Sequence, residues 1–269
     1  MSQPAVLCEI DEGIATITLN DGVRMSPLGD EVIAGLVQAI DQVRADERVR
    51  AIILTGSGKG FCVGADLAHY RWLVDQREQS PSLGEYVGEL MNRMHSVLIA
   101  FKQLPLPVVC AVNGIAAGGG VGLALAGDMV IAARSAYFYL PFFPSLGAVP
   151  DMGATWSMPR AIGRARTLGF ALTGEKLPAS RAEAWGLIWA CVEDEQLQAE
   201  ARRLAKQLAA MPAHSILEAR AIFAAAETNT LSEQLDFERA RQMALVEGDS
   251  FAEGVRAFSE RRVPRFRDD

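Results

Sequence analysis

The chain has 269 residues, of which 50% are hydrophobic, so it is long enough for one large domain or two unequal ones. Its formal net charge of −7 argues against a general nucleic-acid binder, which would present a basic face. The first residues show no signal-peptide pattern, and no apolar run approaches the roughly 20 residues of a membrane span. We therefore expect a cytoplasmic protein that partners neither nucleic acid nor a membrane.

The first part of the chain alternates strand-like and helix-like patterns. Residues 13–20 alternate and are rich in Ile and Thr, which predicts a strand, whereas residues 28–46 carry one apolar stripe, which predicts a helix. Short apolar runs further along predict strands that are covered on both faces. These predicted strands are 49–56, 107–114 and 128–133, with predicted helices at 85–102 and 119–125. The alternation predicts an α/β fold.

The pattern changes after about residue 156. Helical periodicity dominates from there, over residues 156–172, 195–211, 212–227, 231–247 and 251–261. We expect an α/β core with the ligand site over residues 1–195, followed by a helical region over residues 196–269. Residues 77–86 combine Ser, Pro and Gly between two helical patterns, and we expect them to form a mobile loop.

The spacing of cysteines and histidines indicates neither disulfides nor a metal site. The four cysteines lie far apart without a C-x-x-C pair; they are Cys8, Cys62, Cys110 and Cys191. The last three stand in apolar surroundings, which is typical of buried free thiols in a reducing compartment. The three histidines have no partner at metal-ligand spacing, so we expect no metal.

Three consecutive glycines, Gly118 to Gly120, stand where a predicted strand meets a predicted helix. The first N–H groups of a helix lack partners within it, and the helix dipole is positive there, so a ligand oxygen can bind. Close packing of helix against strand explains the glycines equally well. Phosphate motifs fit less well, because Leu123 replaces the last glycine of a dinucleotide fingerprint, and Gly60 follows Lys59 where a P-loop needs Ser or Thr.

A second run of small residues, GFCVGADL at residues 60–67, follows another predicted strand. Ligands of open α/β proteins bind where strands end, so backbone amides from the two turns can converge on one oxygen atom. Such a pair of donors is an oxyanion hole, and removal of one donor typically raises a reaction barrier by roughly 2.7–4 kcal/mol. The chain has no G-x-S-x-G motif, which argues against serine hydrolysis.

With two further segments, GFCVGADL resembles the enoyl-CoA hydratase/isomerase (crotonase) superfamily. These segments are PVVCAVNGIAAGGGVGLALAGDMVIAA at residues 107–133 and EGVRAFSERRVPRF at residues 253–266. The resemblance implies a spiral of repeated ββα units, a C-terminal helical trimerisation region, and a homotrimer or hexamer. It also implies an acyl-CoA thioester substrate, no cofactor beyond that coenzyme A, and the amides of Ala65 and Gly119 as oxyanion-hole donors.

The same resemblance implies which other residues contact the substrate. They are Gly64, Asp66, Leu67, Gly118, Phe142, Phe143 and Trp156, although core packing also explains the aromatic ones. Arg24 is a candidate for the CoA phosphates, in a segment (residues 20–31) that departs from the family pattern, and a solvated arginine is the alternative. Arg261 and Arg262 stand near where relatives place a lysine that reaches CoA across a subunit boundary, and a charged helix end is the alternative.

Hydratases of this superfamily use two glutamates, and this chain has neither at the matching positions. Gly122 stands at the first position and Phe143 at the second, and residues 137–150 contain no acid. Water addition needs a base for the water and an acid for the α-carbon, so ordinary hydration is not expected by this route.

Asp151 is the nearest acid, directly after Pro150 and at the start of a predicted helix. It is either a helix N-cap, a role that aspartate often has, or a catalytic group that faces the acyl chain. Desolvation beside Phe142 and Phe143 would raise its pKa and make it a better base.

The segment around Asp151, residues 149–177, also resembles the subgroup of ring-1,2-epoxyphenylacetyl-CoA isomerases. This resemblance implies an isomerase of fatty-acid or phenylacetate breakdown, in which the oxyanion hole stabilises an enolate and Asp151 moves a proton. Other functions stay open. Aryl-CoA dehalogenases of the superfamily pair a histidine at the position of His95 with an aspartate nucleophile at that of Asp151. A hydratase-like enzyme, or a catalytically silent acyl-CoA binder that does not need Asp151, are the remaining alternatives.

Overall fold

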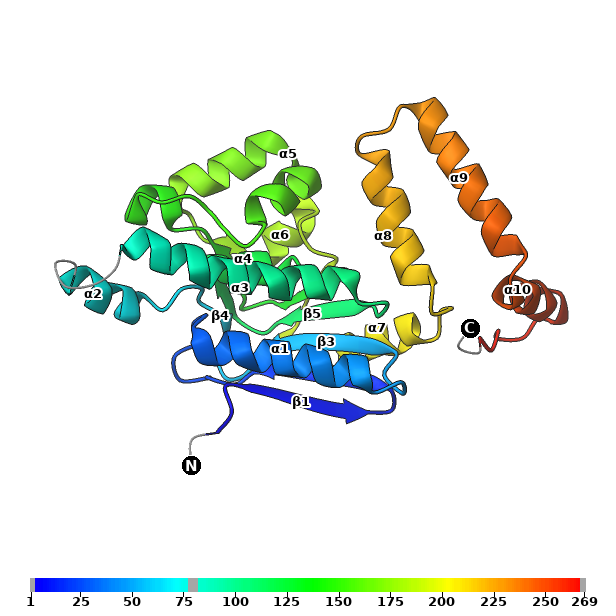
Figure 1. Ribbon diagram of the computed structural model, residues 1–269, viewed down its shortest axis with the longest axis horizontal. Helices are drawn as coiled ribbons and strands as arrows, with labels where there is room; N and C mark the ends of the chain where they lie inside the picture. The colour runs from blue at the N-terminus through cyan, green and yellow to red at the C-terminus, as the bar shows by residue number, and fades with distance from the viewer. Residues whose placement is uncertain (1–2, 77–81, 267–269) are drawn as a thin grey trace.

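The protein folds around two β-sheets, and the computed structural model describes residues 3–76 and 82–266 (Figure 1). The larger sheet contains, in spatial order, β1 (Val6–Asp11), β2 (Ile14–Leu19), β3 (Ala51–Gly56), β5 (Val108–Val112), β7 (Met129–Ala133) and β10 (Ala190–Val192). The smaller sheet contains β4 (Gly60–Cys62), β6 (Ile115–Ala117), β8 (Tyr137–Tyr139) and β9 (Leu177–Pro178). Only β1–β2 and β8–β9 pair antiparallel among the named strands.

The two sheets are wound together. Each of β3, β5 and β7 in the larger sheet is followed by a short strand, β4, β6 or β8, in the smaller sheet, and then by helical structure. The strands β3, β5 and β7 are adjacent and parallel, and so are β4, β6 and β8. Their carboxyl ends therefore come together at one edge, where ligands of α/β proteins bind. This repeated ββα winding confirms the predicted fold class.

Helices cover both faces of the larger sheet. On one side lie α1 (Asp30–Ala45) and α3 (Leu83–Gln103), which pack against each other. On the other side lies α7 (Leu197–Ala209), whose buried Leu197, Ala201 and Leu204 join the core. The remaining helices of this part are α2 (Leu67–Asp75), α4 (Gly119–Ala124), α5 (Ala154–Thr173) and α6 (Ala179–Trp185), with a π-helical turn at Phe142–Leu146 and a 3₁₀ turn at Asp194–Gln196.

The last three helices stand apart from the sheets (Figure 1). They are α8 (Ser215–Ala226), α9 (Leu231–Val246) and α10 (Asp249–Glu260). Several of their large apolar side chains are exposed: Leu217, Phe223, Leu231, Leu235, Met243, Phe251, Val255 and Phe258. Since α7 packs on the sheet and α8 does not, the helices that protrude begin after residue 211. The predicted boundary between the core and a helical region at residue 195 stays a prediction.

The predicted strands and helices are present, with ends that differ by a few residues. The long helix predicted at 156–172 is interrupted at Gly163, whose φ of 76° is left-handed. Three-residue strands such as β4 and β6 were not predicted, because so short a segment shows no periodicity. Within the expected mobile loop, α3 already begins at Leu83, and residues 77–81 lie outside the described residues.

The expected buried thiols are confirmed for Cys62 and Cys110, which are free and fully buried. Burial raises the pKa of each thiol to about 12. Cys8 is free and half-buried. Cys191 is also free but only half-buried, so the prediction of a buried thiol is wrong there, because β10 lies at the edge of the larger sheet. In the described part of the chain, no helix combines the length and apolar character needed to cross a bilayer.

Candidate active site

The two glycine-containing turns predicted from the sequence touch each other at the strand ends. Gly64 follows β4 with a φ of 80°, which favours glycine. A Cβ at this position would lie 2.7 Å from the carbonyl oxygen of Ala117 and 2.9 Å from the amide nitrogen of Gly119. Gly118, also left-handed at 53°, donates its N–H to Tyr139 (2.9 Å). Missing side chains therefore let the two backbones approach closely.

The amides of Ala65 and Gly119 are available for a ligand. Leu28 and Ala65 form a parallel β-bridge, in which the N–H of Leu28 donates to the carbonyl oxygen of Gly64 (2.7 Å). In a parallel bridge of this kind, the N–H of the opposite residue, here Ala65, points away from Leu28. Gly119 is the first residue of α4, where the N–H has no partner within the helix. Among hydrogen bonds between described residues, none uses either amide.

Asp151 lies beside Gly119. A Cβ built on Gly119 would lie 3.3 Å from the Oδ1 atom of Asp151. The residue is not the N-cap of α5, because that position belongs to Gly153 and no side chain caps the helix. The N-cap interpretation is therefore wrong, and the carboxyl group is free for another role.

One oxygen of the Asp151 carboxyl group is buried without a hydrogen-bond partner among the described residues. This atom, Oδ1, is inaccessible to solvent. Desolvation raises the pKa of Asp151 to about 6, although its own backbone N–H and the charge of His95 oppose the rise. Asp151 in turn contributes to the raised pKa of Tyr70, whose main cause is burial of the phenol. His95 on α3 and Tyr70 on α2 thus share the environment of this carboxyl group.

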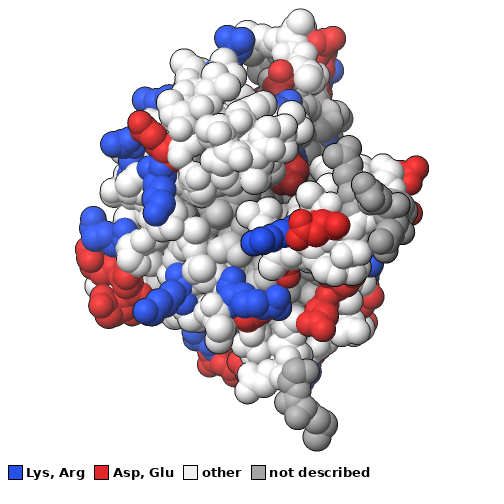
Figure 2. Space-filling view, turned by 90° about the vertical axis from the view of Figure 1, so that its left-hand side faces the viewer, with Lys and Arg blue, Asp and Glu red and all other residues white. Residues whose placement is uncertain are grey.

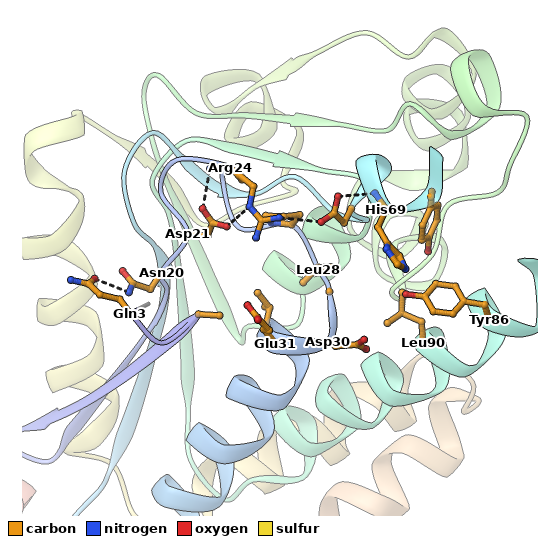
Figure 3. A pocket seen from close by; sticks show the side chains of 16 residues that line it. Gln3, Asn20, Asp21, Arg24, Leu28, Asp30, Glu31, His69, Tyr86 and Leu90 are labelled. Carbon is orange, nitrogen blue, oxygen red and sulfur yellow. Dashed lines mark hydrogen bonds and ion pairs between the residues drawn. The ribbon is translucent and has the colours of Figure 1, made fainter. Parts of the chain in front are cut away.

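A pocket of about 530 Å³ opens next to these turns (Figure 3). We call it the entrance pocket. One wall comes from residues 20, 21, 24 and 27–32, in the loop before α1 and its first turn, with Gln3 and Ala5 beside them. The other wall comes from the region of α2 and α3 and consists of Asp66, His69, Tyr70, Tyr86 and Leu90. Leu28 connects it to the turns, because its Cδ1 atom would lie 3.2 Å from a Cβ on Gly119. The ring of His69 lies 5.4 Å from that of Tyr86.

Arg24 is the basic residue among those that line the entrance pocket, and two acids hold it. Its Nε atom lies 2.7 Å from Asp21, and its Nη1 atom lies 3.2 Å from Asp66 (Figure 3). Asp66 also caps α2, since its Oδ1 atom accepts the N–H groups of Ala68 (3.1 Å) and His69 (3.2 Å). Asp66 thus has a structural role that the sequence did not reveal.

Charges of both signs border this side of the molecule. Figure 2, which views the molecule from the side of α2, shows Lys and Arg interspersed with Asp and Glu around a broad uncharged area in its upper part. The uncharged upper area belongs to the α5 side of the molecule (Figures 1 and 2).

The predicted acyl-pocket residues divide into two groups. Phe142 is 8% exposed, and its ring would lie 3.7 Å from a Cβ on Gly118, so it packs against the glycine turn. Phe143, Leu67 and Trp156 are 43%, 52% and 53% exposed. The guanidinium of Arg160 covers the Trp156 ring at 4.3 Å, and this pair lies on the surface. Exposure does not place a side chain inside or outside an open pocket, so the contact of these three with the acyl chain stays a prediction.

Arg261 and Arg262 are not brought to the entrance pocket within one chain. They follow α10, at the opposite end of the molecule from α2 (Figure 1). Arg262 is paired with Glu253 and Glu260, each at 2.6 Å. Any contact of these arginines with CoA has to come from a second subunit.

Sequence reasoning missed Tyr70, Tyr86 and Met152. The two tyrosines reach the entrance pocket because of how α2 and α3 pack, and their rings lie 6.4 Å apart. Met152 is buried between Asp151 and α4. No local pattern marks these residues, although the position of Met152 next to the candidate acid was a signal available in the sequence.

Comparisons with known proteins agree with this arrangement. The sequence pattern of the family "Enoyl-CoA hydratase/isomerase" matches residues 9–269. The chain is 44% identical to a 1,2-epoxyphenylacetyl-CoA isomerase of Escherichia coli K12, over 97% of both chains. It is 40% identical to a Rhodobacter capsulatus protein named "Probable enoyl-CoA hydratase", over 99% of both chains. The crystal structure of an enoyl-CoA hydratase from Polaromonas superposes with a TM-score of 0.88 at 29% identity, over 97% of this chain and 99% of the other. The chain belongs to the enoyl-CoA hydratase/isomerase family.

Proposed function

We propose that the protein is an acyl-CoA isomerase that stabilises a thioester enolate in an oxyanion hole and moves a proton with Asp151. The observation that carries this proposal is the carboxyl group of Asp151, which is buried beside Gly119 with an oxygen that lacks a partner among the described residues. Burial raises its pKa to about 6, within the range that suits a general base near neutral pH.

The reaction needs two devices. The amides of Ala65 and Gly119 donate hydrogen bonds to the thioester oxygen, so that negative charge on this oxygen is stabilised when a proton leaves carbon. Ionised Asp151 accepts that proton and returns it to another carbon, while the enolate collapses and the double bond moves. The number of atoms and electrons in the acyl group is unchanged, so the proposed step balances with the substrate and the groups of this chain alone.

One carboxyl group suffices for a proton shift but not for ordinary hydration, and this favours isomerase over hydratase activity. Position 122, which carries a glutamate in the hydratases that the sequence resembles, is glycine, and a Cβ there would lie 2.5 Å from that of Met152. Phe143, at the second such position, is exposed. The similarity to the E. coli 1,2-epoxyphenylacetyl-CoA isomerase supports a ring epoxide of phenylacetyl-CoA as one substrate. Enoyl-CoA esters with a shifted double bond are the other substrate class that we propose.

The Asp151→Asn variant tests the proposal. We expect isomerisation of a 3-enoyl-CoA and exchange of its α-protons with deuterated water to fall by about 10²–10⁴-fold, because the amide cannot accept the proton. Acyl-CoA binding should stay within threefold of wild type. Asp236→Asn, at an exposed acid paired with Arg239, is the matched control and should have no effect. Turnover of Asp151→Asn within tenfold of wild type contradicts the proposal, and binding without exchange by wild type indicates a silent binder.

A second candidate function is hydrolytic dehalogenation of an aryl-CoA, with Asp151 as nucleophile. The observation that favours it is the charge of His95, which acts on the Asp151 carboxyl group. In this reaction, a carboxylate oxygen displaces halide from the ring, and histidine assists water in releasing the ester. A single turnover in ¹⁸O-labelled water separates the two functions. Label in Asp151 supports the nucleophile, and its absence supports proton transfer.

The acyl group, the oligomeric state and the cellular compartment are the remaining parts of the proposal. Activity measured with a panel of enoyl-, phenylacetyl- and benzoyl-CoA esters identifies the acyl group. We propose a homotrimer or a pair of trimers, because the exposed apolar residues of α8–α10 need a surface to cover them, and the cytoplasm as the compartment. Sedimentation of the purified chain measures the assembly.

A further inference from the structure

The turn that carries Asp151 is packed into two gaps on α4. At Gly119, a Cβ would lie 3.0 Å from the Cγ atom of Met152. At Gly122, one turn along the same helix, a Cβ would lie 2.5 Å from the Cβ and 2.6 Å from the carbonyl carbon of Met152, and it would overlap the carbonyl oxygen. The side chain and the backbone of Met152 therefore occupy the volume that two side chains on α4 would need.

The backbone of this turn is unusual for its sequence. Met152 has a φ of 51°, in the left-handed region that residues with a Cβ disfavour, and Gly153 follows with 73°. The carbonyl oxygen of Asp151 accepts the N–H of Ala154 (3.0 Å), which closes the turn onto α5. A methionine remains in such a conformation only where its surroundings hold it, and Met152 is 4% exposed.

Polar contacts restrain the Asp151 carboxyl group only in part. Its Oδ1 atom has no partner among the described residues, whereas its own backbone N–H and the charge of His95 act on the group from nearby. A carboxyl group with an unpartnered buried oxygen would turn toward solvent or a donor unless its backbone were held. Packing of the turn supplies this restraint, and Met152 is the adjacent residue that packs against α4.

We infer that Gly122 and Met152 are positioning residues, because the missing side chain at 122 admits the backbone of Met152, which holds the Asp151 carboxyl group against Gly119. The effect of these residues on catalysis rests on the proposed function. Their effect on the position of the Asp151 carboxyl group does not, and it can be measured without substrate.

Two variants and one control test the inference. Gly122→Ala places a methyl group against the Met152 backbone and pushes the turn outward. Met152→Gly removes the side chain of Met152 and keeps a residue that adopts left-handed φ freely, so the backbone conformation of the turn is not strained. Gly169→Ala, in α5, is the matched control, because a Cβ there meets nothing within 4 Å.

The first measurement is titration of ¹³C-labelled aspartate carboxyl groups by NMR, with the Asp151 signal assigned from its loss in Asp151→Asn. We expect the pKa of Asp151 to be about 6 in wild type and Gly169→Ala, and to fall toward the ordinary value of 3.8 in both test variants as the group reaches solvent. The second measurement is isomerase kinetics. We expect kcat to fall about 10- to 100-fold with KM within threefold, because the base is misplaced while the binding surface is kept.

The outcomes separate this inference from the proposed function. A folded Met152→Gly protein with wild-type titration of Asp151 and wild-type kcat overturns the inference, whatever Gly122→Ala does. Displaced titration in the variants, together with full activity of Asp151→Asn, leaves the positioning intact and contradicts the proposed function.

Discussion

Two aspartates at the edge of the core, Asp128 and Asp151, show what a partner does for a buried acid. Asp128, whose side chain is 12% exposed, precedes β7 and receives Arg220 from α8 in two contacts, Nε–Oδ1 at 2.8 Å and Nη2–Oδ2 at 2.6 Å. The N–H of Val108 adds a third, at 2.8 Å. The Oδ1 atom of Asp151 has no partner in the described part of the chain.

The difference is that Asp128 helps to attach a helix to the core, whereas Asp151 is the acid to which we assign proton transfer. The guanidinium of Arg220 also donates to the carbonyl oxygens of Lys102 (2.8 Å), Leu104 (2.6 Å) and Leu106 (3.1 Å), so it fastens the protruding α8 to the core. Each charge there is compensated. At Asp151, desolvation raises the pKa of the carboxyl group, and its ionised form costs folding stability. Burial thus accompanies attachment at Asp128 and, under the proposed function, proton transfer at Asp151.

The largest expected effect on stability follows from removing the partner of Asp128. Arg220→Ala leaves the carboxylate buried and unpaired, and it also removes a donor from three carbonyl groups. We expect the free energy of unfolding to fall by about 3–5 kcal/mol, as measured by urea denaturation. Arg239→Ala is the control, because its pair with Asp236 is largely exposed and should contribute less than about 1 kcal/mol. Equal losses of unfolding free energy in the two variants would show that the Asp128–Arg220 pair contributes no more to stability than an exposed pair.

The reverse effect is expected at Asp151. Its pKa is raised in the folded state, so its contribution to stability is fully present below pH 3.8 and is lost as the pH rises through about 6. The difference between 3.8 and about 6 corresponds to about 3 kcal/mol at most. We expect Asp151→Asn to unfold with about 1–3 kcal/mol more free energy than wild type at pH 8, and with no gain at pH 4. A variant less stable than wild type at pH 8 would mean that the carboxylate has a hidden partner.

Activity should report the same titration. Proton removal requires ionised Asp151, so kcat/KM for isomerisation should fall about tenfold per pH unit below about 6 and level off above it. Measurement of kcat/KM with one enoyl-CoA between pH 5 and pH 8 checks whether the activity falls in this way at low pH. An activity that stays constant down to pH 5 contradicts the role of Asp151 as the base.

The sequence predicted the parts of this site that are local in the chain. Strand ends followed by small residues located Gly64 and Gly119, because parallel strands bring their ends to one edge. Asp151 was found as an acid in a segment otherwise without acids. Its N-cap alternative could not be rejected from sequence, since the choice depended on Gly153, whose left-handed φ appears only in the structure.

Other parts of the site depend on long-range packing. Phe142 and Phe143 are adjacent and chemically identical, yet one is buried against Gly118 and the other is exposed, because a π-helical turn points them in different directions. Tyr70 and Tyr86 meet through the packing of α2 against α3, which no local pattern encodes. The conformation of Met152 depends on a gap on a helix about 30 residues earlier in the chain.

The smallest expected effect concerns a third acid, Asp66, which lies between the two extremes. Its side chain is 26% exposed, it pairs with Arg24, and it keeps two amide hydrogen bonds of α2 when that pair is removed. Arg24→Ala should therefore change the free energy of unfolding by less than about 1 kcal/mol. If Arg24 contacts the CoA phosphates, KM should rise about two- to fivefold with kcat unchanged, and the rise should shrink in high salt. Arg44→Ala, at an exposed pair on α1, is the control. A fall in kcat would instead indicate that Arg24 orients the Ala65–Asp66 turn. The comparison of acids would then extend to a surface charge that holds one of the two turns of the proposed oxyanion hole.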